Sequence, residues 1–323
     1  MKILITGGTG FLGQALVRYY LSESEHTVIV FSRDEWKQAQ MRDAIRDPRV
    51  EFFLGDVREE ARLDLAFQAG VQVVLHAAAL KRVDSVCHDP DEVFKTNVLG
   101  TRNVLHAARR ARVGRVVLVS SDKACYPTNA YGVSKAMAEQ LTIGFNVYGY
   151  PQGVRSSVVR YGNVLGSRGS VVDLWRAQDA RGEALTITDP EMTRFLLSVD
   201  DAVDLIQTAL IHMQGGEIFV PQLPAALMID LARAVVPQAA GHTYTGKRPG
   251  GEKLHETLIT LEESERTWDL GQVSMILPEA HPWRGPLTIT AEATRSYPFT
   301  RRSDLTDRLT VDDLKAMLEG ATL

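Results

Sequence analysis

The chain has 323 residues, of which 45% are hydrophobic and 24% charged, and its formal net charge is −4. This balance is typical of a soluble globular protein and argues against a nucleic-acid or anionic-membrane partner. The length predicts one large unit or two lobes that share a core. Residues 1 and 2 lead straight into the apolar run 3–5, without a signal peptide or membrane span, so we expect a cytoplasmic protein.

The two cysteines, Cys87 and Cys125, lie in different segments without metal-ligand spacing. Neither a disulfide framework nor a zinc site is therefore predicted, and we interpret Cys125 as structural rather than nucleophilic. His76 and His255 are interpreted as core or surface residues rather than ligands. We expect no metal.

Apolar, β-branched runs that are typical of buried strands alternate with segments of helical periodicity. This alternation predicts the α/β class, with a Rossmann-type, doubly wound parallel sheet. The predicted strands span residues 3–6, 27–31, 50–54, 71–76, 115–120 and 153–161, and clear helical periodicity covers 100–111 and 131–145.

After residue 161 the pattern breaks into segments marked by glycine and proline, and the helix 199–213 and strand 217–220 indicate a return to the sheet. We therefore predict an NADP-binding Rossmann domain over residues 1–165, with a return segment at about 196–222. A smaller C-terminal substrate-binding lobe would comprise 166–195 and 223–323.

Residues 6–13 read Thr-Gly-Gly-Thr-Gly-Phe-Leu-Gly and join the first strand to the first helix. A dinucleotide-binding loop needs glycine because its backbone turns tightly and approaches the pyrophosphate, which then faces the helix N-terminus. The position of Gly7, Gly10 and Gly13 between strand and helix favours this function over a ligand-free turn.

The second strand ends in Ser32 and Arg33, followed by Asp34 and Glu35. A carboxylate at a strand end would hold the ribose hydroxyls of NAD, whereas a hydroxyl and an arginine suit the 2′-phosphate of NADP. We favour NADP, and Asp34 and Glu35 either contact the ribose or only begin the next helix.

Tyr131 and Lys135 form a Tyr-x-x-x-Lys pair, which places both side chains on one face of a helix. A lysine ammonium near a phenol favours the phenolate, so the tyrosine can take a proton from an alcohol while hydride leaves the same carbon. After a dinucleotide loop, this pair predicts an oxidoreductase core of the extended short-chain dehydrogenase type.

Asp122 and Lys123 precede this pair at the end of a predicted strand. A 4-epimerase needs only a small hydroxyl there, so an acid and an amine indicate a second proton transfer. Elimination of water fits, because oxidation at C4 of a sugar acidifies the C5 hydrogen and an acid can protonate the departing C6 hydroxyl. Both groups would have to be neutral in the reactive complex, which requires a desolvated site and coupled titration. The alternative is a surface salt pair.

Short stretches spread along the chain carry a family resemblance, namely residues 5–10, 31–35, 55–58, 76–81, 121–124, 160–164, 167–171, 188–195 and 216–221. With these stretches the chain resembles the inverting UDP-N-acetylglucosamine 4,6-dehydratases, extended short-chain dehydrogenase/reductases that supply bacterial surface-glycan pathways. The resemblance implies a 4,6-dehydratase that inverts C5, uses tightly bound and recycled NADP, and forms homo-oligomers.

The resemblance also implies residue roles. Asp122 would be the acid, Lys123 the base, Tyr131 the C4 oxidation base and Lys135 its partner. Cofactor contacts would come from Gly7, Thr9, Gly10, Phe11, Leu12, Gly13, Ser32, Arg33, Lys37, Asp56, Val57, Ala77, Lys81, Tyr131, Lys135 and Val164. The UDP-sugar would be held by Lys81, Asn163, Arg168, Arg194, Arg248 and Glu252.

Two departures from the family pattern bear on these roles. Tyr131 stands where the membrane-bound retaining relatives typically have methionine, which favours the soluble inverting branch. The family's late Arg-Pro-Gly-Glu-Lys-Leu stretch contains one extra glycine here, at Gly250-Gly251, which changes the register of Arg248 and Glu252. Another nucleotide-sugar conversion, such as a 5,6-dehydratase or 4-epimerase, and a non-catalytic NADP sensor remain alternatives.

Overall fold

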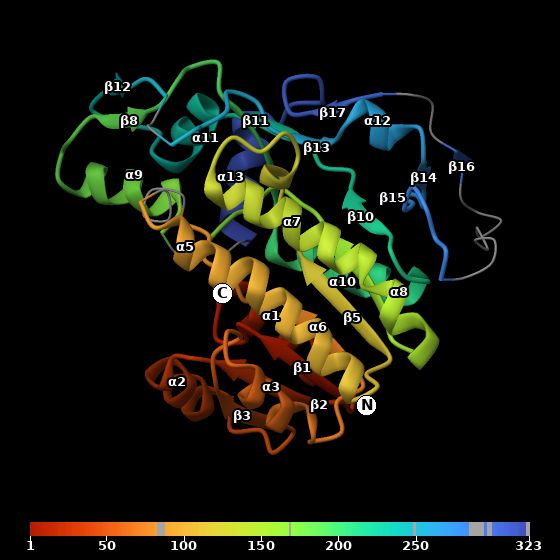
Figure 1. Ribbon diagram of the computed structural model, residues 1–323. Helices are drawn as coiled ribbons and strands as arrows, with labels where there is room; N and C mark the ends of the chain where they lie inside the picture. The colour runs from red at the N-terminus through yellow and green to blue at the C-terminus, as the bar shows by residue number, and fades with distance from the viewer. Residues whose placement is uncertain (83–87, 168, 248–249, 284–293, 296–298, 321–323) are drawn as a thin grey trace.

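The computed structural model describes residues 1–82, 88–167, 169–247, 250–283, 294–295 and 299–320. Its centre is a ten-stranded sheet in the order β16-β14-β15-β10-β6-β5-β4-β1-β2-β3 (Figure 1). The strands from β10 to β3 in this order are all parallel. They are β1 (Lys2–Thr6), β2 (Thr27–Ser32), β3 (Val50–Leu54), β4 (Val73–His76), β5 (Arg115–Val119), β6 (Arg155–Val159) and β10 (Ile218–Pro221). The predicted doubly wound parallel sheet is thus confirmed.

Helices cover both faces of this sheet because successive strand residues are apolar on both sides. Leu4 of β1 belongs to one buried cluster, and its neighbours Ile3 and Ile5 belong to the other. One face is covered by α1 (Phe11–Glu23), α2 (Glu35–Ile45) and α10 (Val199–His212), and the other by α3 (Glu60–Phe67), α6 (Gly100–Arg110) and α7 (Ala130–Gly144).

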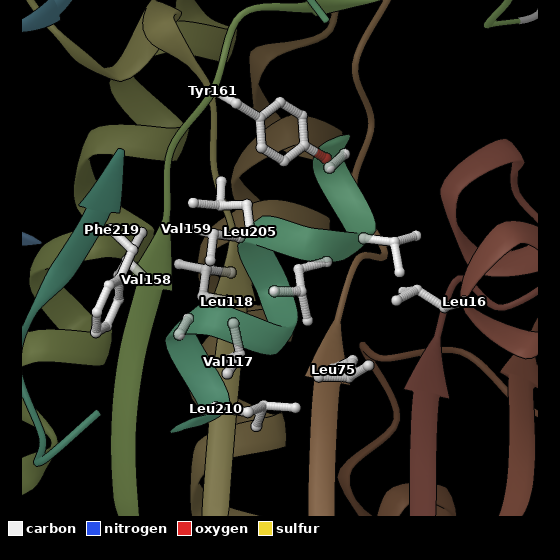
Figure 2. Packing of buried hydrophobic residues seen from close by; sticks show 14 of the residues in the cluster. Leu16, Leu75, Val117, Leu118, Val158, Val159, Tyr161, Leu205, Leu210 and Phe219 are labelled. Atoms are coloured by element: carbon white, nitrogen blue, oxygen red, sulfur yellow. The ribbon is translucent and has the colours of Figure 1, made fainter. Parts of the chain in front are cut away.

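Figure 2 shows the packing on the α10 face, where Leu210 of α10 lies near Val117 of β5 and Leu205 lies near Val159 of β6. Phe219 of β10, which is fully buried, belongs to the same cluster. The chain therefore returns to the sheet after residue 197, and β10 pairs with β6 in parallel.

A hairpin extends the sheet beyond β10 and differs from the sequence prediction, which assigned all of 223–323 to the second lobe. β15 (Val273–Ile276) pairs antiparallel with β10, and β14 (Thr267–Asp269) and β16 (Thr294–Arg295) follow. All four residues of β15 are buried. The hairpin satisfies the backbone groups of β10 and buries more apolar surface, which explains its place in the main sheet.

The second lobe has its own apolar core, which contains Trp175, Leu231 and Leu314. Around this core lie a three-stranded sheet and a strand pair with three helices. These elements are β7 (Asn163–Val164), β8 (Leu185–Ile187), β9 (Thr193–Leu197), β11 (Ala225–Leu227), β12 (His242–Tyr244), α9 (Val171–Ala180), α11 (Met228–Val235) and α13 (Val311–Gly320).

Short elements complete the fold. β13 (Thr257–Ile259) pairs with β17 (Arg301–Arg302), and α5 (Pro90–Val93) and the π-helix η1 (Phe94–Leu99) lead into α6. The others are η2 (Asp122–Ala124), α8 (Asn146–Gly149), η3 (Tyr150–Gln152) and α12 (Leu261–Ser264). Among the described helices, none combines the length and the apolar character that crossing a bilayer requires.

Candidate active site

A cleft of about 1260 Å³ runs from the glycine loop, past the carboxyl ends of the parallel strands, to the second lobe. Every predicted site residue that the structure describes lines this cleft, except Asp122, which is fully buried. Arg168 and Arg248 lie outside the described residues. The chain therefore brings together in one cleft side chains that are far apart in the sequence. No three described His, Cys, Asp or Glu side chains gather as metal ligands.

The glycine loop forms a backbone cradle at the N-terminus of α1. Gly7 has a φ of +69°, and a Cβ there would lie 3.0 Å from the backbone of Ala78. A Cβ on Gly13 would lie 2.6 Å from the carbonyl oxygens of Gly7 and Gly8. Gly10 is the N-cap residue of α1, and no side chain makes a capping hydrogen bond to this end of the helix. A loop that excludes side chains and exposes a helix N-terminus fits the pyrophosphate of a dinucleotide.

The end of β2 presents a hydroxyl and a guanidinium to the cleft. Ser32 is buried, and Gln38 donates from Nε2 to its hydroxyl oxygen at 3.0 Å. The Arg33 side chain is half exposed and lies 4.0 Å from the Asp56 carboxylate, which accepts a 2.7 Å hydrogen bond from Arg58. Asp34 accepts from the backbone N–H of Lys37 as the N-cap of α2. The interpretation of Asp34 as a helix-starting residue thus has a direct structural basis.

The catalytic candidates meet where β5 ends and α7 begins. The backbone N–H of Asp122 donates to the Tyr161 carbonyl at 2.9 Å, which fixes η2 against the chain after β6. The Asn129 side chain caps α7 by accepting from Gly132 at 2.8 Å. The cap places Tyr131 in the first turn of α7, where it faces the cleft.

Lys135 lies one helical turn after Tyr131 and is buried, and its Nζ donates to the Val119 carbonyl. Burial lowers the pKa of Lys135 to about 8, against the opposing effect of the Glu139 carboxylate. Burial also raises the pKa of the Tyr131 phenol, and the ammonium that opposes this shift is that of Lys123. In this structure, then, the lysine whose charge favours the Tyr131 phenolate is Lys123.

Asp122 and Lys123 are in direct contact, with Nζ 2.9 Å from Oδ1. Ser121 also donates to Oδ1, whereas the buried Oδ2 has no hydrogen-bond partner in the structure. Burial raises the pKa of Asp122, although the neighbouring Lys123 opposes the shift. Burial by itself would lower the pKa of Lys123, but the carboxylates of Asp122 and Glu256 outweigh it and raise this pKa.

Glu256 was not predicted from the sequence. It is buried directly before β13, with Oε1 3.6 Å from Lys123 Nζ and Oε2 2.7 Å from Lys253 Nζ. One signal for it exists in the sequence, because Glu256 adjoins the apolar run Thr257–Ile259, where a charged residue needs a partner.

The extra glycine lies where the segment before Glu256 meets the catalytic loop. Gly250 and Gly251 have φ values of +101° and +81°. A Cβ on Gly251 would lie 2.2 Å from the Thr128 carbonyl oxygen, and the Thr128 hydroxyl donates to the Gly251 carbonyl. Both glycines thus adopt left-handed conformations, and Gly251 permits close contact with the loop before α7.

Arg194 lines the cleft, but its guanidinium is largely engaged. It donates to the carbonyls of Thr193, Lys253 and Leu254 at 2.7–3.0 Å, and lies 3.7 Å from Glu252. These bonds attach β9 to the segment that carries Glu252 and Lys253. The contacts of Arg194 and Glu252 with a nucleotide-sugar stay predictions.

A second buried charge cluster adjoins the cleft through Ser120. Arg160 is 2.6 Å from Glu139 of α7 and 2.9 Å from Glu263 of α12, and Ser120 donates to Glu139. Cys125 is buried beside Arg160, at 3.0 Å, and burial raises the pKa of its thiol. A protonated, inaccessible thiol fits the structural interpretation of Cys125.

The two histidines are also engaged in structural contacts. The His76 ring lies 2.6 Å from the Thr6 hydroxyl and 3.0 Å from the Thr101 hydroxyl, and burial lowers its pKa to about 3. Nδ1 of His255 lies 2.8 Å from the Thr193 hydroxyl.

Comparison with known proteins identifies the family. A family model described as "Polysaccharide biosynthesis protein" matches residues 3–278. The UDP-N-acetylglucosamine 4,6-dehydratase (inverting) of Campylobacter jejuni subsp. jejuni serotype O:2 is 40% identical over 279 residues, which cover 86% of this chain and 83% of that protein. A UDP-glucose 4-epimerase of Rickettsia conorii is 43% identical over 275 residues, which cover 83% and 80%.

Solved structures agree with this assignment. The X-ray structure of Pen from Bacillus thuringiensis has a TM-score of 0.90 and 32% identity, and the match covers 99% of this chain and 97% of that one. The dTDP-glucose 4,6-dehydratase DesIV of Streptomyces venezuelae has a TM-score of 0.70 and 25% identity, covering 78% and 86%. The chain belongs to the polysaccharide biosynthesis protein family, and the resemblance to the inverting UDP-N-acetylglucosamine 4,6-dehydratases is confirmed.

Proposed function

We propose that this protein is an NADP-dependent UDP-N-acetylglucosamine 4,6-dehydratase that inverts C5 and yields UDP-2-acetamido-2,6-dideoxy-β-L-arabino-hexos-4-ulose. The observation that carries the proposal is the placement of Lys123 beside Tyr131 at the cleft, with the buried Asp122 in direct contact with Lys123. An acid and an amine next to an oxidation base supply the two additional proton transfers of an elimination. The resemblance extends the proposal to a cytoplasmic homo-oligomer for bacterial surface-glycan biosynthesis.

Each side chain has one task in this proposal. Tyr131 takes the proton of the C4 hydroxyl, Lys123 takes the proton from C5, and Asp122 protonates the C6 hydroxyl, which leaves as water. Bound NADP would accept a hydride from C4 and return it to C6, so that no net oxidation occurs. The raised pKa of Asp122 supports its role as the acid. Lys123 must lose a proton before it can act as a base.

The cofactor site supports a nicotinamide dinucleotide, and we favour NADP. The glycine cradle fits the pyrophosphate, and the buried Ser32 offers a hydroxyl where NAD enzymes place a carboxylate. Arg33 lines the cleft beside Ser32 and can contact a 2′-phosphate. The Asp56 carboxylate is held by Arg58, which lessens its repulsion of a phosphate.

A 4-epimerase is the second candidate, because relatives at 43% identity carry that name. Epimerisation needs the C4 oxidation base alone and leaves Asp122 and Lys123 without a task. A 5,6-dehydratase would use the same acid and base but would not return the hydride to C6. A pure NADP sensor would use none of these side chains.

The proposed function predicts a specific product. After incubation with UDP-N-acetylglucosamine in deuterated buffer and without added cofactor, proton NMR should show a 4-keto-6-deoxy sugar with deuterium at C5 and the L-arabino configuration. Deuterium is expected because the base exchanges its proton with solvent before C5 is reprotonated. A C4 epimer, a 5,6-alkene or unchanged substrate would each contradict the dehydratase assignment.

Two variants should separate oxidation from elimination. Tyr131→Phe removes the base for the C4 hydroxyl, so no reduced nicotinamide should form on mixing with substrate. Lys123→Ala should still bind NADP and should oxidise C4 more slowly, because it removes the charge that favours the Tyr131 phenolate, whereas product formation should fall by about 10²- to 10⁴-fold. Absorbance of the reduced nicotinamide and NMR of the sugar measure the two steps. Unchanged turnover of Lys123→Ala would refute the base assignment.

The lowered pKa of Lys135 predicts a pH dependence of NADP binding. Lys135 loses its proton as the pH of the ligand-free protein rises through about 8. If the bound nucleotide holds the ammonium form, its affinity is constant below this pH and falls by up to about tenfold per unit above it. Nucleotide titration should show this slope in the wild type and a flat response in Lys135→Arg. An equal slope in both proteins would exclude Lys135 as its source.

Arg33→Ala should weaken NADP binding and leave NAD binding nearly unchanged. The lost charged contact to the 2′-phosphate corresponds to about 1.5–3 kcal/mol, or about 10- to 100-fold in Kd. Titration of nucleotide-free protein with both dinucleotides measures the ratio. Lys2→Ala, whose side chain pairs with Glu51 instead, is the matched control. An equal loss for NAD and NADP would contradict the assignment of Arg33 to the 2′-phosphate.

A further inference from the structure

Glu256 is a buried ionisable side chain beside Lys123 that has no task in the proposed mechanism. Glu256 is 2% exposed and lies on the segment that leads into β13. It is one of two carboxyl groups beside the same ammonium, since Asp122 Oδ1 is 2.9 Å and Glu256 Oε1 is 3.6 Å from Lys123 Nζ. The Lys123 ammonium thus lies near two acids in a buried site.

The backbone of Glu256 is fixed from both sides. Its N–H donates to the Ser303 hydroxyl at 3.0 Å, and the Ser303 N–H donates to the Glu256 carbonyl at 2.9 Å. The Ser303 hydroxyl also lies 2.6 Å from the Thr193 hydroxyl. These buried bonds join three segments and hold the Glu256 carboxylate at a defined distance from Lys123.

The charges around the two acids are unequal. Lys123 of η2, Arg194 of β9 and Lys253 of the preceding segment all face Glu256. Although burial alone would raise the pKa of Glu256, these cations outweigh it and lower that pKa. Asp122 has Lys123 as its only cation partner among the described ion pairs, and the Glu256 charge disfavours its ionisation.

The hydrogen bonds of Asp122 agree with this difference. Both donors, Ser121 Oγ and Lys123 Nζ, reach Oδ1, and the buried Oδ2 has no hydrogen bond. Glu256 Oε2 also lacks a hydrogen bond but lies 2.7 Å from the Lys253 ammonium, whereas no described ion pair involves Asp122 Oδ2. An ionised carboxylate with an unpartnered buried oxygen is costly, whereas a carboxylic acid carries its proton on that oxygen and loses much less solvation.

We propose that Glu256 is the counter-ion of Lys123, and that it thereby leaves Asp122 protonated as the acid of the reaction. Glu256 is a positioning residue, because it acts on the reaction through Lys123 and Asp122. The inference deepens the proposed dehydratase function and rests on it.

Glu256→Gln tests the proposal because it keeps the shape and removes the charge. The Lys123 ammonium, which then lacks its second carboxylate, should favour ionisation of Asp122, so that C4 oxidation persists but elimination slows because the acid has lost its proton. We expect reduced nicotinamide to accumulate at the wild-type rate while product formation falls by about 100-fold. The alkaline limit of product formation should also move to lower pH. Wild-type turnover with an unshifted pH profile would overturn the proposal.

Matched variants separate this role from a general effect on folding. Glu262→Gln removes an exposed carboxylate of α12, close to Glu256 in sequence, and should leave both steps unchanged. Glu256→Asp keeps the charge and should restore part of the elimination rate that Glu256→Gln loses. If Glu256→Asp is as impaired as Glu256→Gln, charge is not what the site requires and the proposal fails.

An infrared measurement tests the proton on Asp122 without any substrate. The wild-type holoenzyme at neutral pH should show a carbonyl band of a protonated carboxyl group that disappears in Asp122→Asn. The same band should be missing from Glu256→Gln. Absence of the band from the wild type would overturn the inference even if the dehydratase reaction is confirmed. Its presence without a dehydrated product would refute the proposed function alone.

Discussion

The site depends on one constraint of parallel sheets, namely that all strands present their carboxyl ends at the same edge. β1 lies between β2 and β4. After β1 the chain continues to β2 on one side of β1, whereas β4 lies on the other side. The loops that follow β1 and β4 therefore diverge and leave a crevice between them. Gly7 lies there against the backbone of Ala78, where no side chain fits. Because β5 and β6 continue the same edge, the dinucleotide cradle and the catalytic side chains share one cleft.

Buried charge is the second constraint, and the molecule handles it in two ways. Arg160 lies between Glu139 and Glu263 and donates to both carboxylates, so this cluster can serve as a rigid support that links α7 to α12. Lys123 likewise lies between two carboxyl groups, but one oxygen of Asp122 has no partner. A fully bonded cluster stabilises structure, whereas an incompletely bonded one keeps a proton available for chemistry.

Much of the fold and of the candidate site could be predicted because the signals are local. The parallel strands have continuous apolar sequences, and the glycine loop and Tyr131-Lys135 have fixed spacings within single elements. The hairpin of β14 and β15 was missed because its place beside β10 depends on which sheet edge is free. Glu256 was missed because its partner Lys123 is distant in sequence, and no local pattern links a carboxylate to a remote lysine.

By itself, the sequence determined the order of strands and helices, the backbone freedom of the glycine loop and the presence of an acid, an amine and a phenol in one short stretch. Periodicity and backbone sterics act between near neighbours, which is why these features can be read without coordinates. Only the tertiary structure decided the electrostatics of the site. Burial and the distances from Lys123 to Asp122 and Glu256 depend on the docking of the 250–256 segment onto the catalytic loop, and charge interactions depend on distance in space rather than along the chain.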